Sequence, residues 1–139
     1  DTNSNKIRYL VKKKNINFYK IDNYSKNLIS ETKKYSHLLN RNIDIAFLSL
    51  GENYHIASLF YDFPIIYQSN YAALTYSDKF KFLRISINQR LISKTKKIFL
   101  FINGKNRLKD FDFIFKKKIF NFYFNKKAQK KLIIVIKKK

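Results

Sequence analysis

The sequence contains no cysteine and no methionine, and only two of its 139 residues are histidine. Without cysteine, the chain has neither a disulfide framework nor a thiolate metal site. The two histidines, His37 and His55, lie far apart with no paired acidic spacing around them, so we expect no zinc or iron site. The longest apolar runs, residues 43–50 and 132–136, are far shorter than a membrane span. We therefore expect a cytoplasmic protein with no membrane partner.

Acidic residues are also scarce. The chain has nine acidic and 30 basic residues, so its formal charge is +21. Such a charge is typical of proteins that bind nucleic acid or anionic membranes. However, lysine dominates over arginine, and the chain is rich in Lys, Asn, Ile, Phe and Tyr, all of which have AT-rich codons. We interpret the charge as the product of an AT-rich genome and do not expect nucleic acid as a partner. A basic nucleic-acid-binding protein remains the alternative.

At 139 residues, the chain is long enough for one domain with a hydrophobic core. Helical and strand-like patterns alternate along it, which favours βα units. We predict a single α/β domain, residues 1–139, with a mainly parallel, Rossmann-like sheet flanked by helices. The expected helices span residues 4–11 and 25–40, and the expected strands span residues 43–50, 71–76, 98–102 and 132–136.

The most informative segment is the apolar run 43–50, followed by Gly51 and, four residues later, His55. A near-continuous apolar run is typical of a central parallel strand that is buried on both faces. Ligands of open α/β sheets lie beyond the carboxyl ends of such strands, so His55 is placed where chemistry is usually done. A histidine can serve as a general base when a partner fixes its tautomer.

This segment resembles the signature of the 6-phosphogluconolactonase family, in which an apolar strand precedes Leu-Gly-x-x-Asp-Gly-His or Leu-Gly-x-Asp-Gly-His, followed by Thr-Ala-Ser-Leu-Phe-Pro. Asn53 stands in place of the family Asp, and Tyr54 in place of the second Gly. If that glycine has a positive φ, Tyr54 predicts a different backbone path. The positions that agree with the pattern are Gly51, His55, Ala57, Ser58, Leu59 and Phe60.

The resemblance continues in family order over residues 1–108. Residues 84–88, Arg-Ile-Ser-Ile-Asn, resemble the family's Arg-Ile-Thr-Leu-Thr, and residues 98–107 resemble a strand followed by Gly-x-x-Lys, with Arg107 for Lys. Glucosamine-6-phosphate deaminases share the fold. Their His-Ile-Ala is followed by Phe-Asn-Glu-Pro, whereas this chain continues with Ser-Leu-Phe, so the lactonase branch fits better.

The resemblance implies hydrolysis of 6-phospho-D-glucono-1,5-lactone to 6-phosphogluconate, in the oxidative pentose phosphate pathway, with no metal or organic cofactor. The partner would be a small phosphosugar lactone. His55 would activate the attacking water and Asn53 would orient the imidazole. The substrate would be held by Gly51, Arg84, Gly104 and Arg107, and we expect the arginines to converge with His55 on one crevice.

The family's first strand, its Gly-Gly-Ser phosphate loop and its Asp-Glu-Arg segment have no counterpart in these residues. Together with the absence of methionine, this leads us to expect the C-terminal part of a longer protein, with an upstream half as a possible partner. A noncatalytic relic of the fold, acting as a binding or assembly component, is the main alternative to the enzyme.

Overall fold

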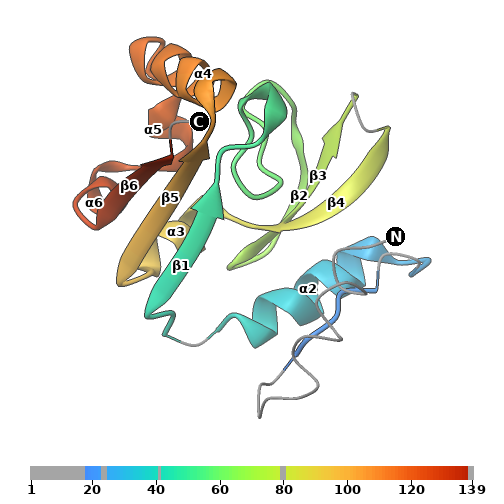
Figure 1. Cartoon of the computed structure of the whole chain (residues 1–139). Helices are drawn as coiled ribbons and strands as arrows, with labels where there is room; N and C mark the ends of the chain where they lie inside the picture. The colour runs from blue at the N-terminus through green and yellow to red at the C-terminus, as the bar shows by residue number, and fades with distance from the viewer. Residues whose placement is uncertain (1–17, 23–24, 41, 79–80, 138–139) are drawn as a thin grey trace.

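The computed structural model describes residues 18–22, 25–40, 42–78 and 81–137, and within them the chain forms two three-stranded sheets (Figure 1). Labels follow Figure 1, so the first described helix is α2, Leu28–Leu38. It begins later than residue 25 because the side chain of Asn27 caps it, accepting a 2.9 Å hydrogen bond from the amide of Ser30. The expected helix at residues 4–11 lies outside the described residues. No described helix is long and apolar enough to cross a membrane.

The first sheet is parallel and contains β1 (Ile45–Ser49), β5 (Lys97–Asn103) and β6 (Leu132–Lys137), in the order β1-β5-β6. The three predicted strands are thus present, but their arrangement corrects the prediction that residues 43–50 form the central strand. Among the described residues, β5 is the central strand and β1 pairs only with β5. An apolar run predicts that a strand can be buried, but it does not predict how many strands pair with it.

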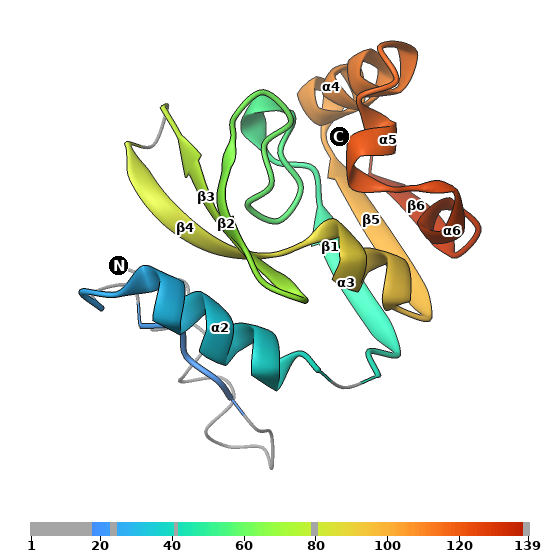
Figure 2. The same cartoon turned by 180° about the vertical axis from the view of Figure 1, so that it is seen from behind.

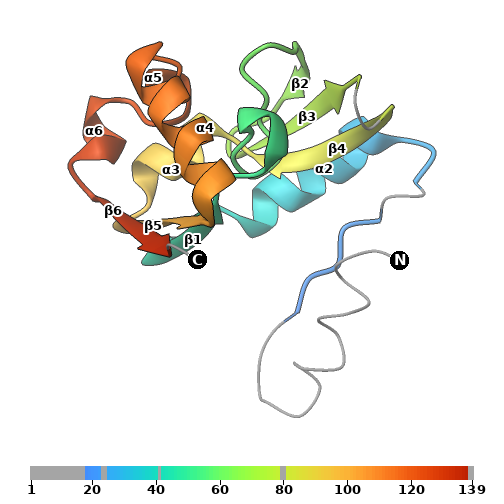
Figure 3. The same cartoon turned by 45° about the horizontal axis from the view of Figure 1, so that its top comes forward.

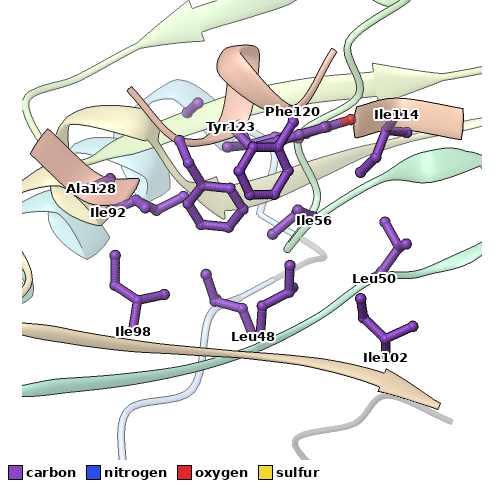
Figure 4. Packing of buried hydrophobic residues seen from close by; sticks show 14 residues of the cluster. Leu48, Leu50, Ile56, Ile92, Ile98, Ile102, Ile114, Phe120, Tyr123 and Ala128 are labelled. Atoms are coloured by element: carbon purple, nitrogen blue, oxygen red, sulfur yellow. The ribbon is translucent and has the colours of Figure 1, made fainter. Parts of the chain in front are cut away.

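One face of the parallel sheet carries the core, covered by four helices: α3 (Gln89–Lys94), α4 (Lys105–Lys116), α5 (Phe120–Tyr123) and α6 (Lys126–Gln129) (Figure 2). Figure 4 shows Leu48, Ile98 and Ile102 of the sheet facing Ile92 and Tyr123 of the helices. These side chains are all at most 9 % exposed. Burying each large aliphatic side chain contributes about 1.5–3 kcal/mol, so this layer fixes the position of β1.

The opposite face of the same sheet is exposed. Phe47 of β1 is 68 % exposed, Ile45 is 49 % exposed and Ile133 of β6 is 42 % exposed. The prediction that the 43–50 strand is largely buried is therefore wrong for this face, because no described helix covers it (Figure 1).

The second sheet is antiparallel and contains β2 (Ile65–Gln68), β3 (Ala72–Ser77) and β4 (Phe82–Ile87), in that order. The predicted α/β class is confirmed. The strand predicted at residues 71–76 is present as β3, but the antiparallel sheet that it forms with β2 and β4 was not predicted. The connections between its strands are too short for a parallel crossover, which needs a dozen residues or more. Helix α2 packs beside it, where the hydroxyl of Ser36 accepts a 3.0 Å hydrogen bond from the amide of Tyr71.

Candidate active site

The loop that follows β1 folds back on itself directly after the strand. The amide of Leu50 continues the pairing with β5 by donating to the carbonyl of Phe101 at 3.2 Å. A short 3₁₀ turn, Glu52–Tyr54, then reverses the chain, and the amide of Gly51 donates to the carbonyl of His55 at 2.9 Å. The segment 51–60, here called the histidine loop, thereby brings His55 back over the end of β1. Figure 3 shows this loop between the parallel sheet and the antiparallel sheet.

Gly51 leaves the space that the imidazole of His55 occupies. A Cβ atom at Gly51 would lie 2.3 Å from Cε1 and 2.4 Å from Nε2 of that ring, so any side chain there would force the ring to move. The backbone of Gly51 is ordinary, with φ −87°, so the requirement is for space and not for an unusual dihedral angle. The resemblance implied that Gly51 binds the substrate. The close approach of the His55 ring gives Gly51 a second role, which is to leave room for that ring.

The tautomer of His55 follows from its hydrogen bond. Nδ1 of His55 bonds to the backbone carbonyl of Glu52. Because a carbonyl oxygen can only accept, Nδ1 carries the hydrogen and Nε2 is left as an acceptor for a proton. The sequence analysis gave the orienting role to Asn53; the described bond is made by the backbone of its neighbour, and the role of Asn53 remains a prediction.

The pKa of His55 lies below its usual value. Partial burial of the ring is the largest cause, and the positive charges of Arg84 and Arg107 lower the pKa further. The hydrogen bond to the carbonyl of Glu52 acts in the opposite direction and raises it. The lowered pKa favours the neutral ring, which is the form that a general base requires.

The tip of the loop uses a left-handed backbone. Asn53 has φ 56° and Tyr54 has φ 60°. Asparagine tolerates this region, whereas a tyrosine there is strained. Tyr54 thus takes a positive φ itself, and the different backbone path relative to the family glycine stays a prediction. Its ring is stacked on Phe113 of α4 with centroids 4.9 Å apart, a contact that compensates part of the strain.

The far end of the loop is held by the antiparallel sheet through Ser58. The amide of Ser58 donates to the hydroxyl of Ser86 in β4 at 3.0 Å, and its carbonyl accepts from the hydroxyl of Thr75 in β3 at 2.7 Å. Thr75 and Ser86 are at most 4 % exposed, so these bonds form away from solvent. The sequence analysis missed both anchors. The alternation of Arg84 and Ser86 along one strand face is the signal that could have found Ser86.

A pocket of about 330 Å³ lies beside His55. Its walls come from four places: Tyr35 of α2, Ser49 of β1, Ser58 of the histidine loop and Ser86 of β4 are among its lining residues. Gly51, Asn53, Arg84, Gly104 and Arg107 are not among the residues that line it. Of the six predicted site residues, the pocket itself thus contains His55.

The two arginines do not line the pocket, but their positive charges act on His55. Arg84 is half-buried on β4, with its guanidinium 4.8 Å from the ring centroid of Phe82. Arg107 is in the first turn of α4 and forms a 2.6 Å ion pair with Asp110. Both lower the pKa of His55, so both contribute positive potential at the ring.

Gly104 connects β5 to α4. Its φ of 89° is a conformation that favours glycine, and its amide donates to the carbonyl of Lys137 at 2.9 Å. No cluster of three or more His, Cys, Asp or Glu side chains suited to a metal occurs within the described ranges.

With this geometry in place, comparison with known proteins identifies the family. Residues 1–121 match the model of the glucosamine-6-phosphate isomerases/6-phosphogluconolactonase family. The chain belongs to this family. The match extends beyond residue 108, where the sequence resemblance ended. No match is found among the curated proteins.

Solved structures agree on the fold. A 6-phosphogluconolactonase from Plasmodium vivax superposes with a TM-score of 0.73 at 19 % identity, over 99 % of this chain. One from Shewanella baltica gives 0.72 at 17 % identity over 90 % of this chain. The enzyme from Thermotoga maritima gives 0.62 at 20 % identity over 81 % of this chain. The matched parts span only 62 %, 58 % and 52 % of those proteins, respectively.

Proposed function

We propose that this protein hydrolyses 6-phospho-D-glucono-1,5-lactone to 6-phosphogluconate. The observation that carries the proposal is the position of His55, whose imidazole lines the pocket and is held by a hydrogen bond from Nδ1 to a backbone carbonyl. That bond makes Nε2 the ring nitrogen that can accept a proton. Family membership supplies the substrate class.

In the proposed reaction, Nε2 of His55 takes a proton from a water molecule. The water oxygen attacks the lactone carbonyl carbon, and the bond from that carbon to the ring oxygen breaks as the tetrahedral intermediate collapses. The ring oxygen leaves as a hydroxyl after taking the proton back from the imidazolium. Water and lactone are thus converted into the acid, with His55 regenerated.

Arg84 and Arg107 would attract the phosphate of the substrate. An arginine binds phosphate through a bidentate pair of hydrogen bonds, and two nearby positive charges suit a dianion. Arg107 is already paired with Asp110, so binding through it would require that pair to open or to be shared.

The second candidate is a noncatalytic relic that serves as a binding or assembly component. Asn53 in place of the family Asp favours it, since an amide cannot stabilise an imidazolium by charge.

The test is lactone hydrolysis above the spontaneous rate, measured by NMR with the protein as its host expresses it. We expect His55→Gln to lower kcat by about 10²–10⁴-fold, the usual contribution of a general base, whereas His37→Gln at an exposed position leaves it unchanged. Arg84→Ala should chiefly raise KM, and Asn53→Asp should raise the rate. If the wild type and Asn53→Asp both show only spontaneous hydrolysis, the enzyme proposal fails and the relic stands.

A further inference from the structure

The pocket beside His55 has walls that are polar but uncharged. Its volume of about 330 Å³ lies within the range of small-molecule sites, about 300–1,000 Å³. No Asp, Glu, Lys or Arg occurs among the described residues that line it. Hydroxyl-bearing residues line it instead, namely Tyr35, Ser49, Ser58 and Ser86. Because moving a charge out of water without a partner is costly, such walls suit an uncharged group that forms hydrogen bonds.

The hydroxyl of Tyr35 is available to a ligand in this pocket. The hydroxyl of Ser86 already accepts a hydrogen bond from the amide of Ser58 at 3.0 Å. The half-buried Tyr35, by contrast, forms no side-chain hydrogen bond within the part of the chain that the structure describes. Burial raises the pKa of Tyr35, so its hydroxyl keeps its proton at neutral pH and can donate a hydrogen bond.

Helix α2 fixes the position of Tyr35 through its contact with the antiparallel sheet. Thr32 and Ser36, one helical turn apart, are at most 4 % exposed and mark the buried face of α2. Ser36 binds the amide of Tyr71 next to β3. Tyr35 is three residues after Thr32 and therefore lies beside this face, where it lines the pocket. Figures 1 and 3 show α2 and the histidine loop on different sides of β4, so Tyr35 and His55 approach the pocket from different directions.

We propose that Tyr35 binds the sugar part of the substrate by donating a hydrogen bond from its hydroxyl to a sugar hydroxyl, while the phosphate stays outside the pocket. This assignment rests on the proposed function, since it places the uncharged part of that substrate between the uncharged walls. The phosphate faces the positive charges of Arg84 and Arg107, neither of which lines the pocket. Contacts at both ends of the substrate then keep the lactone carbonyl carbon within reach of His55.

The test compares two ligands, 6-phosphogluconate and inorganic phosphate, whose dissociation constants are measured by NMR titration with the protein as its host expresses it. Tyr35→Phe keeps the ring and removes only the hydroxyl. We expect it to weaken 6-phosphogluconate binding about 2–10-fold, the usual loss for one uncharged hydrogen bond, and to leave phosphate binding unchanged. Arg84→Ala should weaken the binding of both ligands. Tyr67→Phe is the matched control and should change neither, because Tyr67 on β2 is also half-buried but does not line the pocket.

Lactone hydrolysis, measured in parallel, separates the role of Tyr35 from the proposed function. Tyr35→Phe should raise KM by the same factor with little change in kcat, since the hydrogen bond is present in the bound substrate and in the transition state alike. If the wild type hydrolyses the lactone and Tyr35→Phe binds both ligands as the wild type does, the role of Tyr35 is wrong and the lactonase proposal stands.

Other outcomes are equally decisive. Equal weakening of both ligands by Tyr35→Phe would show that Tyr35 only supports the structure of the site, which overturns its role in sugar binding. Selective weakening of 6-phosphogluconate with only spontaneous hydrolysis would retain that role and overturn the lactonase proposal. A wild-type protein that does not bind 6-phosphogluconate would overturn both.

Discussion

The imidazole of His55 lies directly on the backbone of Gly51, four residues earlier, where a Cβ atom would be 2.3 Å from Cε1. The same two residues are joined by a 2.9 Å hydrogen bond from the amide of Gly51 to the carbonyl of His55. Gly51 therefore both makes room for the ring and closes the loop. This explains why a glycine is needed at this position after β1 although its φ is ordinary.

Gly51→Ala should expel the ring from its seat. We expect the hydrogen bond from Nδ1 to the carbonyl of Glu52 to break and the fold to lose about 1–3 kcal/mol, the usual cost of an added methyl in a filled space. The ¹⁵N chemical shifts of His55 report the tautomer, and urea unfolding reports the stability.

Gly104→Ala is the matched control because the two glycines are needed for different reasons. Nothing lies within 4 Å of a Cβ built at Gly104, but its φ is +89°. Its substitution should cost about 1–2 kcal/mol through backbone strain and leave the shifts of His55 unchanged. If Gly51→Ala and Gly104→Ala change the ¹⁵N chemical shifts of His55 equally, the steric explanation of Gly51 is wrong.

Stability should depend on pH through His55. Its pKa is lowered in the fold, chiefly by burial, so the unfolded chain binds a proton at a higher pH than the folded chain does. Unfolding then takes up a proton, and stability falls as the pH decreases from about 6.5 through the lowered folded pKa. Urea midpoints measured between pH 7 and 5 should show this slope, above the range in which most carboxylates titrate.

His55→Gln should flatten the slope, and His37→Gln should retain it, because His37 is exposed on α2. NMR titration of the His55 ring gives the folded pKa directly. A midpoint at or above the unfolded value would contradict the burial argument.

The sequence located the strand and the histidine correctly because both are local properties. The apolar run 43–50 contains β1, and Gly51 and His55 follow it as the pattern predicts. Two other features depend on contacts with other parts of the chain, which a local sequence pattern does not specify. The position of β1 at a sheet edge depends on which strands are present, and the hydrogen bond from His55 uses a backbone carbonyl, which any residue at position 52 would supply.

Thr75 and Ser86 should stabilise the histidine loop through their hydrogen bonds to the backbone of Ser58. Ser86→Ala removes the acceptor for the amide of Ser58, and Thr75→Val removes the donor to its carbonyl. Each leaves a partly buried backbone group without its partner, which costs about 1–3 kcal/mol. Because one residue holds both bonds, the double variant should lose less than the sum of the single losses, as urea unfolding would measure.

Ser77→Ala is the control on the same strand as Thr75. Ser77 is fully buried, and its hydroxyl has no hydrogen-bond partner among the described residues. Removing that hydroxyl should leave stability unchanged or raise it, since an unsatisfied buried polar group is unfavourable. Strict additivity of Thr75→Val and Ser86→Ala would show that the two bonds act independently.

Tyr54 combines an unfavourable backbone with a favourable contact, and the two can be separated. Its φ of 60° costs a non-glycine residue about 1–2 kcal/mol, while its ring stacks on Phe113 at 4.9 Å. Tyr54→Gly relieves the strain and removes the stack, so its net effect on the free energy of unfolding should be small. In a Phe113→Ala background, the stack is already absent and only the strain remains to be relieved. Tyr54→Gly should therefore be more favourable there by about 0.5–1.5 kcal/mol, the usual worth of an aromatic pair. Asparagine tolerates a positive φ better than tyrosine does. In the Phe113→Ala background, the free energy of unfolding of the Tyr54→Asn variant should therefore lie between those of the variants with tyrosine and with glycine at position 54. If Tyr54→Gly has the same effect in both backgrounds, the ring of Phe113 does not hold the loop, and the tyrosine at this position needs another explanation.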